Sequence, residues 1–521
     1  MTDDLLIGVD LGTSVVKATL YTAAGDALAH AARPVALRQP APGIAEQEPD
    51  EFVAHTVAIL GELVARAGVD GARVAAIACD GQMGGIMGID RDWRAVTPWL
   101  PSTLDDRYLP YLARVEATHG DVIMQRAGSV PIAGPRLLWW REEDPARFGR
   151  MAKIVMLAGY VTGRLGGLTA DAAFVDPSYL TWFGMTDTGR RAWAPDLVDL
   201  WRVDAAMLPR IVPATTVVGA LAPWAARASG LRAGTPLVAG AGDQVAGFLG
   251  AGLVAEGDCI DVAGTFPVFA GCTDRFVVDT AFGALQSLAG PLGDDHWYVM
   301  MYISGGGLTH RWFAREFARD VMEKHGEDWG AVFATLDAEA AAVAPGSDGL
   351  LFFPHLGGRS SPTVPHVRGG WLGATWSHTR AHFYRALLES MAYDYAGGLA
   401  SIRHHAPGGV SGDVTVIGGG ARSPLWTQIK ADVLGLRYHV LANADRATLG
   451  SAIMAGHGVG IFPDMAATAQ AMRHVTRTTM PEPARHRRYQ PMAAAYRDAY
   501  GDLDGIFRRL AGLRANPAAE G

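Results

Sequence analysis

The sequence predicts an α/β protein that divides into two or three domains. Its 521 residues are too many for a single hydrophobic core. Two distant stretches repeat one pattern, residues 7–14 (Ile-Gly-Val-Asp-Leu-Gly-Thr-Ser) and 259–266 (Cys-Ile-Asp-Val-Ala-Gly-Thr-Phe). Each is a hydrophobic run with one carboxylate, followed by a Gly-Thr corner and a second apolar strand. We therefore expect each stretch to open a domain.

The N-terminal segment follows the order strand, strand, strand, helix, strand. Residues 5–9 and 15–21 form a hairpin, and residues 27–37 add a third strand. After a proline-rich loop, Pro49 and the carboxylates behind it start a helix, because proline and acidic residues suit the first helical turn. A short buried strand follows over 74–79. This order opens an actin-like, ribonuclease H-type α/β domain.

A similar order follows the second corner. The expected elements there are strands over 259–262, 267–270 and 297–304 and a helix starting near Gly306. Further along, the pattern predicts an amphipathic helix over 379–402, a strand over 414–417, helices over 424–434 and 449–456, and a terminal helix beyond about residue 480. We place the boundary near 236–243, which gives an N-terminal domain over 1–242 and a C-terminal domain over 243–521.

The composition is that of a globular protein and disfavours several classes. Apolar residues make up 49% and charged residues 19%, and the net charge is −8. No Lys/Arg-rich block is present, so neither nucleic acid nor a membrane surface is an expected partner. The N-terminus lacks a secretory leader, and no apolar run predicts a membrane span. Cys79, Cys259 and Cys272 show no CxxC spacing, so we expect free thiols and a cytoplasmic location.

The two Gly-Thr corners are candidate phosphate sites. A glycine corner lets the backbone approach a ligand closely, and its N–H groups together with a threonine hydroxyl can hold phosphate oxygens. A single copy is equally an ordinary hairpin. Two facing copies would hold a polyphosphate from both sides. The residues expected to do so are Gly12, Thr13, Ser14, Gly264 and Thr265.

Two glycine-rich turns follow predicted strands. Residues 240–242 (Gly-Ala-Gly) precede Asp243 at a helix start, where open α/β sheets place ligands; Asp243 is either a helix cap or a catalytic base. Val245 stands where a dinucleotide fingerprint needs its third glycine, so Rossmann-type binding is disfavoured. Residues 418–420 are three glycines on which an adenine or ribose could lie, or simply a flexible turn. No Walker A sequence exists.

Taken together, these segments resemble the FGGY family of carbohydrate kinases in the actin-like ATPase superfamily, over essentially the whole chain. Residues 7–14 and 261–266 resemble the family's two phosphate segments, and Asp243 falls on its catalytic aspartate. Residues 418–423 resemble the adenosine segment, and the stretch after Leu350 resembles the second signature region. The resemblance implies two actin-like domains with an interdomain active-site cleft.

The resemblance also implies an activity: transfer of the γ-phosphoryl group of ATP to a sugar or polyol hydroxyl. Phosphoryl transfer needs charge neutralisation and positioning more than covalent chemistry. Asp10, with Asp243, would hold Mg²⁺, mainly through water. Asp243 would also accept the proton of the attacking hydroxyl, and Gln244 would bind a neighbouring hydroxyl. The nucleotide would lie against Gly306, Gly307, Gly419 and Gly420.

The acceptor side departs from familiar members of the family. Gln82 and Met83 are followed by Gly84, where xylulokinases have a histidine. The interval from Trp99 to the Asp105-x-Arg107 triplet is longer than in xylulokinases and resembles that of autoinducer-2 kinases. The expected acceptor is a pentulose such as xylulose, or a related ketose or polyol; an autoinducer-2-type kinase is the alternative.

Plainer interpretations remain open for several residues. Gln82, Met83 and Trp99 could be core residues, and His404 and His405 are expected to be solvated. Two alternative functions remain: that of a non-metabolic actin-like ATPase, and that of a family member that binds sugar without turnover. The expected partners are ATP and a small sugar, and a homodimer is the expected oligomer because C2 symmetry is the commonest.

Overall fold

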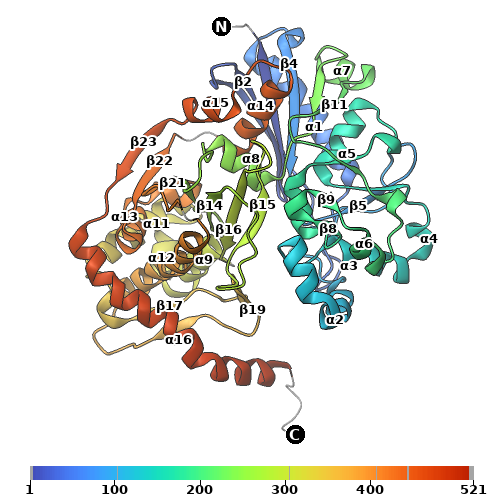
Figure 1. The fold of residues 1–521 in the computed structure, drawn as a ribbon. Helices are drawn as coiled ribbons and strands as arrows, with labels where there is room; N and C mark the ends of the chain where they lie inside the picture. The colour runs from blue at the N-terminus through green and yellow to red at the C-terminus, as the bar shows by residue number, and fades with distance from the viewer. Residues whose placement is uncertain (1–3, 102–103, 304, 407, 443–444, 516–521) are drawn as a thin grey trace.

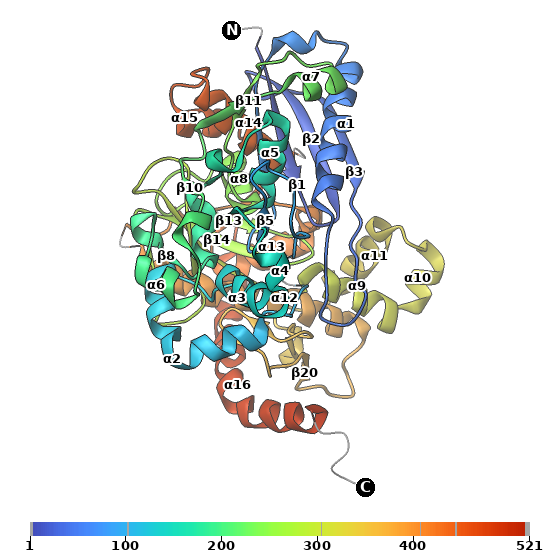
Figure 2. The same cartoon turned by 90° about the vertical axis from the view of Figure 1, so that its right-hand side faces the viewer.

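The computed structural model describes residues 4–101, 104–303, 305–406, 408–442 and 445–515. Two lobes face each other, each built on a twisted sheet with helices packed against it (Figures 1 and 2). The two sheets have six and seven strands. The predicted α/β class with two domains of this kind is confirmed.

The first sheet is formed mainly by the N-terminal segment. Its strands in spatial order are β11 (Val217–Ala220), β12 (Pro236–Val238), β4 (Val74–Gly81), β1 (Leu5–Leu11), β2 (Val15–Thr22) and β3 (Ala27–Pro34). β1, β2 and β3 pair antiparallel, whereas β4 and β12 run parallel to β1. Every residue of β1 is buried, because helices cover both faces of this central strand. The helix α1 (Pro49–Ala67), which starts at the predicted proline, packs against β2 and β3 of the same sheet.

The second sheet repeats this connectivity. Its order is β15 (Gln286–Ala289), β16 (Trp297–Tyr302), β14 (Val268–Thr273), β13 (Cys259–Val262), β21 (Asp413–Ile417), β22 (Arg437–Leu441) and β23 (Val475–Thr479). β13 and β14 form the hairpin and β21 runs parallel to β13. The sequence analysis missed β15, whose four residues are too short to show alternation. Its antiparallel pairing with β16 completes that edge of the sheet, and the predicted end of β16 at residue 304 lies outside the described residues.

Insertions into the two sheets build the rest of each lobe. Between β4 and β12 lie β5 (Met87–Ile89), α2 (Leu109–Ala127), α3 (Ala133–Glu143), α4 (Pro145–Phe148), β6 (Lys153–Val155), α5 (Leu157–Gly166), β7 (Phe174–Val175), the 3₁₀ helix η3 (Pro177–Trp182), β8 (Thr186–Asp187), β9 (Ala192–Trp193), α6 (Pro195–Leu200), β10 (Arg210–Ile211) and α7 (Pro223–Ser229). Between β16 and β21 lie α9 (Gly306–Phe317), α10 (Arg319–His325), α11 (Trp329–Ala341), β17 (Leu351–Phe353), β18 (Arg359–Ser360), β19 (Thr363–Val364), β20 (Gly370–Leu372) and α12 (Arg380–His405). The remaining helices are α8 (Asp243–Gly250), α13 (Pro424–Leu434), α14 (Arg446–Gly458), α15 (Met465–Ala471) and α16 (Pro483–Ala515).

One expectation about the helix surfaces is wrong. His405, at the end of α12, is not simply solvated: its Nε2 lies 3.1 Å from Oδ1 of Asp279. Asp279 also accepts a hydrogen bond from Ser401 at 2.8 Å and is buried. The adjacent-histidine pattern gave no sign of this partner, which comes from a loop before β15.

Within the described part of the chain, no helix is long and apolar enough to cross a membrane.

The helices α8 and α14 cross on the first sheet with their backbones in contact. α14 packs against α8, β1 and β4, although it lies near the C-terminus of the chain. A Cβ on Gly450 would lie 1.9 Å from the Ala246 carbonyl oxygen, and one on Gly250 would lie 2.0 Å from that of Arg446. A Cβ on Gly8 would lie 1.8 Å from the carbonyl oxygen of Thr448. These glycines are therefore required for the crossing.

We expect Gly450→Ala to lower the melting temperature. The added methyl group has no room against a backbone carbonyl, and such overpacking costs about 1–3 kcal/mol. Gly397→Ala in α12 is the control, because nothing lies within 4 Å of its Cβ position. This control gains helix propensity and should melt no lower than the wild type. Equal melting temperatures for Gly450→Ala and the wild type would contradict the required contact.

Candidate active site

A charged cluster lies at the end of β1. The antiparallel register of β1 and β2 places Asp10 opposite Lys17. Lys17 Nζ lies 3.0 Å from Asp10 Oδ2 and 2.7 Å from Oδ2 of Asp445, which precedes α14. Burial raises the pKa of Asp10, Lys17 lowers it, and Asp445 raises it again. One lysine thus joins two carboxylates that come from opposite ends of the chain.

A further carboxyl, Asp80, lies beside Asp10 on the parallel strand β4. It is fully buried, and its Oδ2 accepts a hydrogen bond from Ser451 Oγ of α14 at 2.6 Å. Burial, followed by the nearby charge of Asp10, raises its pKa well above the usual range. In the part of the chain that the structure describes, neither Oδ1 of Asp10 nor Oδ1 of Asp80 has an N–H or hydroxyl donor.

Asp243 begins α8, with Gly242 in the capping position before it. Among the residues that the structure describes, its Oδ1 accepts one hydrogen bond, from the adjacent Gln244 N–H at 2.7 Å. Burial and the charge of Asp10 raise the pKa of Asp243 to about 7, against a lowering by that N–H. The structure therefore does not use this carboxylate as a conventional helix cap.

The turn that carries Asp243 is held by η3. Ser178 Oγ accepts a hydrogen bond from the Gly242 N–H at 2.9 Å, and the Tyr179 hydroxyl donates to the Ala241 carbonyl at 2.9 Å. Gly240 has φ +71°, and a Cβ there would lie 1.9 Å from the Cys79 carbonyl oxygen. The first glycine of this turn is therefore required by backbone packing against β4.

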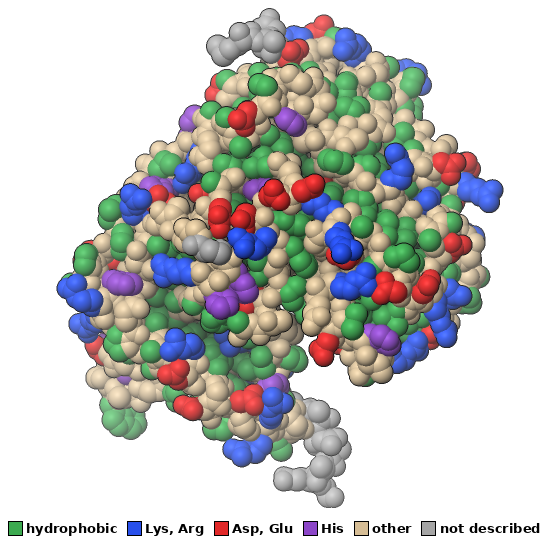
Figure 3. All heavy atoms as spheres, in the orientation of Figure 1, with side chains coloured by type: hydrophobic (Ala, Val, Ile, Leu, Met, Phe, Trp, Pro, Cys, Tyr) green, Lys and Arg blue, Asp and Glu red, His purple; other side chains and the backbone are tan. Residues whose placement is uncertain are grey.

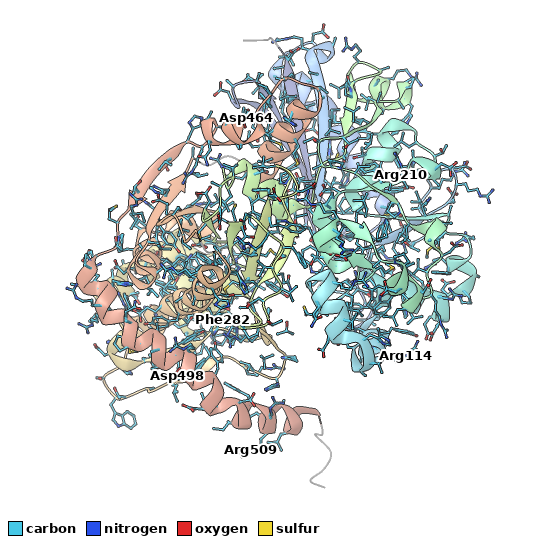
Figure 4. All side chains as sticks on the ribbon, in the orientation of Figure 1. Arg114, Arg210, Phe282, Asp464, Asp498 and Arg509 are labelled. Carbon is cyan, nitrogen blue, oxygen red and sulfur yellow. The ribbon has the colours of Figure 1, made fainter. Side chains whose placement is uncertain are left out.

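A cavity of about 720 Å³ lies between the two sheets and connects these groups. Asp10, Lys17, Asp243 and Gln244 line it on the side of the first sheet. Residues 445–447 at the start of α14 line the same side, where Asp445 pairs with Lys17. Across from them the cavity is lined by Val262, Ile417 and Gly418 at the strand ends of the second sheet. Figure 3 shows acidic and basic side chains gathered where the two lobes meet. In Figure 4, Arg114 and Arg210 on one lobe and Asp498 and Arg509 on α16 lie away from that junction.

Three predicted glycine segments of the second lobe converge on one place. The Gly307 N–H donates to the carbonyls of Gly264 and Thr265 at 3.2 and 3.0 Å. The Gly420 N–H donates to the Ala263 carbonyl at 2.9 Å. The segments around 264, 306 and 419 are therefore in direct backbone contact, and Thr265 is exposed.

The carboxylate of the second corner has a different environment from that of Asp10. Asp261 is fully buried: its Oδ2 lies 2.6 Å from Lys430 Nζ, and its Oδ1 accepts from the Tyr395 hydroxyl at 2.9 Å. Lys430 Nζ also lies 3.6 Å from the centre of the Trp426 ring. Asp261 thus anchors α13 to the sheet, whereas its counterpart Asp10 lines the cavity.

The acceptor-side candidates Gln82, Met83 and Trp99 lie beside the Asp243 turn. A Cβ on Gly242 would lie 2.4 Å from Met83 Cε, so Met83 packs directly on that turn. Trp99 is fully buried, and its Nε1 donates to Gln82 Oε1 at 3.1 Å. This burial is compatible with the interpretation of Trp99 as a core residue. Its indole N–H nevertheless contacts Gln82, a candidate for binding the sugar.

Asp105 and Arg107 form an ion pair with each other. Arg107 Nη2 lies 2.6 Å from Asp105 Oδ2, and Nη1 lies 2.8 Å from Glu46 Oε1. The guanidinium also stacks 4.5 Å from the Trp139 ring centre. Asp105 is fully buried and accepts the Ala45 N–H at 3.1 Å. These contacts of Asp105 all use Oδ2 and fix a loop, whereas Oδ1 of Asp105 is buried and has no hydrogen-bond donor among the described residues.

Arg136 of α3 is a residue that the sequence analysis missed. It is fully buried, and its Nη1 donates to the carbonyls of Gly84 and Leu100 at 3.0 and 2.8 Å. Its Nη2 donates to the Pro101 carbonyl at 3.0 Å. One guanidinium thus joins the turn after Gln82 to the loop after Trp99.

The sequence analysis also missed Lys17, Asp80 and Asp445, although the hairpin register would have placed Lys17 opposite Asp10.

We expect Lys430→Met to destabilise the second lobe, because it leaves Asp261 buried without a counter-charge, at a cost of about 3–5 kcal/mol. Adding Asp261→Asn to that variant removes the buried charge and should restore part of the loss. The measurement is the midpoint of urea unfolding. Arg437→Met, which breaks an exposed pair with Asp413, is the control and should cost at most about 1 kcal/mol. Equal shifts in the two single variants would refute the anchoring role of Lys430.

The comparisons with known proteins agree over most of the chain. Residues 5–250 match the N-terminal domain of the FGGY family of carbohydrate kinases, and residues 272–459 match its C-terminal domain. A xylulose kinase of Bacillus subtilis is 27% identical over 98% of this chain and 99% of its own length. An autoinducer-2 kinase of Klebsiella pneumoniae is 29% identical over 85% of this chain and 84% of its own.

Solved structures show the same likeness. The crystal structure of xylulose kinase from Rhodospirillum rubrum has a TM-score of 0.87 and 27% identity, and covers 97% of this chain and 100% of its own. A ligand-bound xylulose kinase from Lactobacillus acidophilus, at 20% identity and a TM-score of 0.88, shares the fold. The chain therefore belongs to the FGGY family of carbohydrate kinases, enzymes that transfer a phosphoryl group from ATP to an alcohol group of a sugar.

Proposed function

We propose that this kinase phosphorylates a pentulose such as xylulose, or a related ketose or polyol, with Asp243 as the base. The observation that carries the proposal is the shared cavity: Asp243 and Asp10 line one side, and Gly418 lines the other. Xylulose kinases that align with nearly the whole chain support the choice of acceptor. The proposed domains are residues 1–242 and 243–521, with the reaction between them.

In this proposal Asp243 accepts the proton of the attacking hydroxyl. Burial raises its pKa to about 7, which makes the ionised carboxylate a stronger base than an exposed aspartate. Within the described ranges, its one hydrogen bond comes from the neighbouring N–H, which leaves the other carboxylate oxygen for the sugar hydroxyl. Gln82, Met83 and Gln244, which lie on or beside the same turn, would bind the rest of the sugar, with Trp99, Asp105 and Arg107 behind them.

The phosphates of ATP would lie between the two corners. Gly12, Thr13 and Ser14 would contact them from the first lobe, and Gly264 and Thr265 from the second. The nucleoside would lie against the converging glycine segments, Gly306, Gly307, Gly419 and Gly420. Closure of the lobes would exclude water, which otherwise competes with the sugar for the γ-phosphate.

The residues at the end of β1 suit Mg²⁺. Oδ1 of Asp10 is buried without an N–H or hydroxyl donor among the described residues, and Mg²⁺ binds oxygen ligands and keeps several waters. Asp10 and Asp243 would hold the ion, mainly through water, while Lys17 balances the second oxygen of Asp10. When bound, the ion neutralises charge on the phosphate oxygens.

A linear, autoinducer-2-like dihydroxy ketone is the second candidate acceptor. The autoinducer-2 kinase of Klebsiella pneumoniae is as similar to this chain as the xylulose kinases are. Gly84 and the long interval from Trp99 to Arg107 favour this candidate. We further propose a cytoplasmic enzyme, consistent with three buried free cysteines, and a homodimer.

Asp243→Asn should abolish most acceptor-dependent turnover. The amide keeps the shape but cannot accept the proton, and the loss of a general base costs about 10²–10⁴-fold in kcat. The measurement is ADP release with a panel of pentuloses, aldoses, polyols and a linear dihydroxy ketone. Asp498→Asn on the surface of α16 is the control.

The panel also discriminates between the acceptors. Highest kcat/KM on a pentulose supports the first proposal, and highest kcat/KM on the linear ketone supports the second. Wild-type enzyme that releases no more ADP with any acceptor than without one would contradict both.

Asp10→Asn should raise the Mg²⁺ concentration needed for half-maximal activity. A carboxylate that holds the ion through water typically contributes about 10- to 100-fold in metal affinity. The measurement is a Mg²⁺ titration of ADP release at saturating ATP and sugar. The Asp498→Asn control should titrate like the wild type; an unchanged Mg²⁺ requirement in Asp10→Asn would exclude Asp10 from the metal site.

A further inference from the structure

A buried chain of three side-chain hydrogen bonds runs from the acceptor side to the first phosphate corner. Trp99 Nε1 donates to Gln82 Oε1 at 3.1 Å, and Gln82 Nε2 donates to Gln47 Oε1 at 3.0 Å. Gln47 Nε2 then donates to the Thr13 carbonyl at 2.8 Å. Gln47 and Trp99 are fully buried, and Gln82 is nearly so. We call this series the amide chain.

The direction of the amide chain is fixed by its two ends. An indole N–H can only donate, and a backbone carbonyl can only accept. Each glutamine between them must therefore present its oxygen towards Trp99 and its nitrogen towards Thr13. Reversing either amide would set two donors or two acceptors against each other in a buried site, which costs the full penalty of unpaired polar groups.

At the acceptor end, this direction decides what Gln82 can offer a ligand. Its oxygen is occupied by Trp99, and one N–H is occupied by Gln47. The second N–H of Nε2 has no acceptor among the residues that the structure describes. Gln82 therefore offers one free N–H to an oxygen of the sugar, while its own oxygen, already bonded to Trp99, has a second lone pair that can accept one more hydrogen bond.

At the other end, Gln47 fixes a peptide plane in the phosphate corner. The Thr13 carbonyl and the Ser14 N–H belong to one planar trans peptide, so they point in opposite directions. Holding the carbonyl at 2.8 Å from Gln47 Nε2 aims the Ser14 N–H away from the buried side. A second contact of Gln47 Nε2, to the Ala36 carbonyl at 3.4 Å, lies on the same buried side.

We propose that Gln47 is a positioning residue that couples the acceptor contact of Gln82 to the phosphate contact at Thr13–Ser14. The inference rests on the proposed function, in which these two places bind sugar and ATP. Gln47 touches neither substrate in this scheme. Its backbone is held independently, because its N–H and carbonyl pair with those of Trp99 at 2.9 and 3.0 Å. Side-chain variants therefore keep the local chain path.

The test is a double-mutant cycle on the best sugar of the panel. Gln47→Met and Gln82→Met should each lower kcat/KM for the sugar about tenfold, the value of one buried hydrogen bond. If Gln47 acts through Gln82, the double variant should be about tenfold better than the product of the two single losses. Each enzyme is also measured for KM of ATP.

Gln47→Glu separates the two ends of the amide chain. A glutamate oxygen still accepts the Gln82 N–H, but the carboxylate cannot donate to the Thr13 carbonyl and repels it. We expect the KM for the sugar to stay within about threefold of wild type, since that hydrogen bond remains, while kcat falls and the KM for ATP rises. A merely structural role would not produce this division.

The control is Thr56→Val in α1, which removes a buried hydrogen bond of 2.7 Å to the Phe52 carbonyl that is not part of the amide chain. It should lower the melting temperature and leave both KM values unchanged. The inference would be overturned if the loss in the double variant equals the product of the two single losses. It would also be overturned if Gln47→Glu loses sugar affinity as Gln47→Met does. In both cases sugar-dependent turnover by the wild type would still support the proposed function. A wild type without any sugar-dependent turnover would overturn both.

Discussion

The close crossing of α8 and α14 on β1 is the contact on which the rest of the site depends. Backbone touches backbone there, because glycines at 8, 250 and 450 leave no side chain between the three elements. The crossing brings the start of α8, with Asp243, and the start of α14, with Asp445, to the end of the strand that carries Asp10. A bulkier residue at any of these glycines would move a charged group of the cavity.

This arrangement places more carboxyl groups than cationic side chains in a buried space. Asp10, Asp80, Asp243 and Asp445 lie near one another, and Lys17 is the cation bonded to two of them. Burial, followed by the nearby charge of Asp10, raises the pKa of Asp80 well above its usual range. The remaining negative charge is what a divalent cation and a proton-accepting base both require. Stability and chemistry thus oppose each other here, as is common at active sites.

The sequence predicted what is local and missed what the fold assembles. Both Gly-Thr corners, the turn before Asp243 and the glycines at 418–420 each lie within a few neighbouring residues, so strand and turn patterns identify them. The hydrogen bond between Ser451 and Asp80 joins residues 371 positions apart, so no local sequence pattern predicts it. The same holds for Arg136 and Gln47, which act on backbone carbonyls and so need no complementary residue type. The domain boundary and the roles of the site residues stay predictions.

The duplicated corners show how one fold can divide a reaction between two similar halves. Both strands carry a carboxylate before a Gly-Thr corner, yet Asp261 is neutralised in the core by Lys430, which comes from α13 behind the sheet. Asp10 is paired with Lys17 from its own hairpin, lines the cavity, and lies beside a second carboxyl, Asp80, on β4. A buried, neutralised pair adds rigidity but no reactive charge. We infer that the second corner only holds the nucleotide, and that Asp10 and Asp243 act from the side of the first sheet, against which α14 packs together with α8.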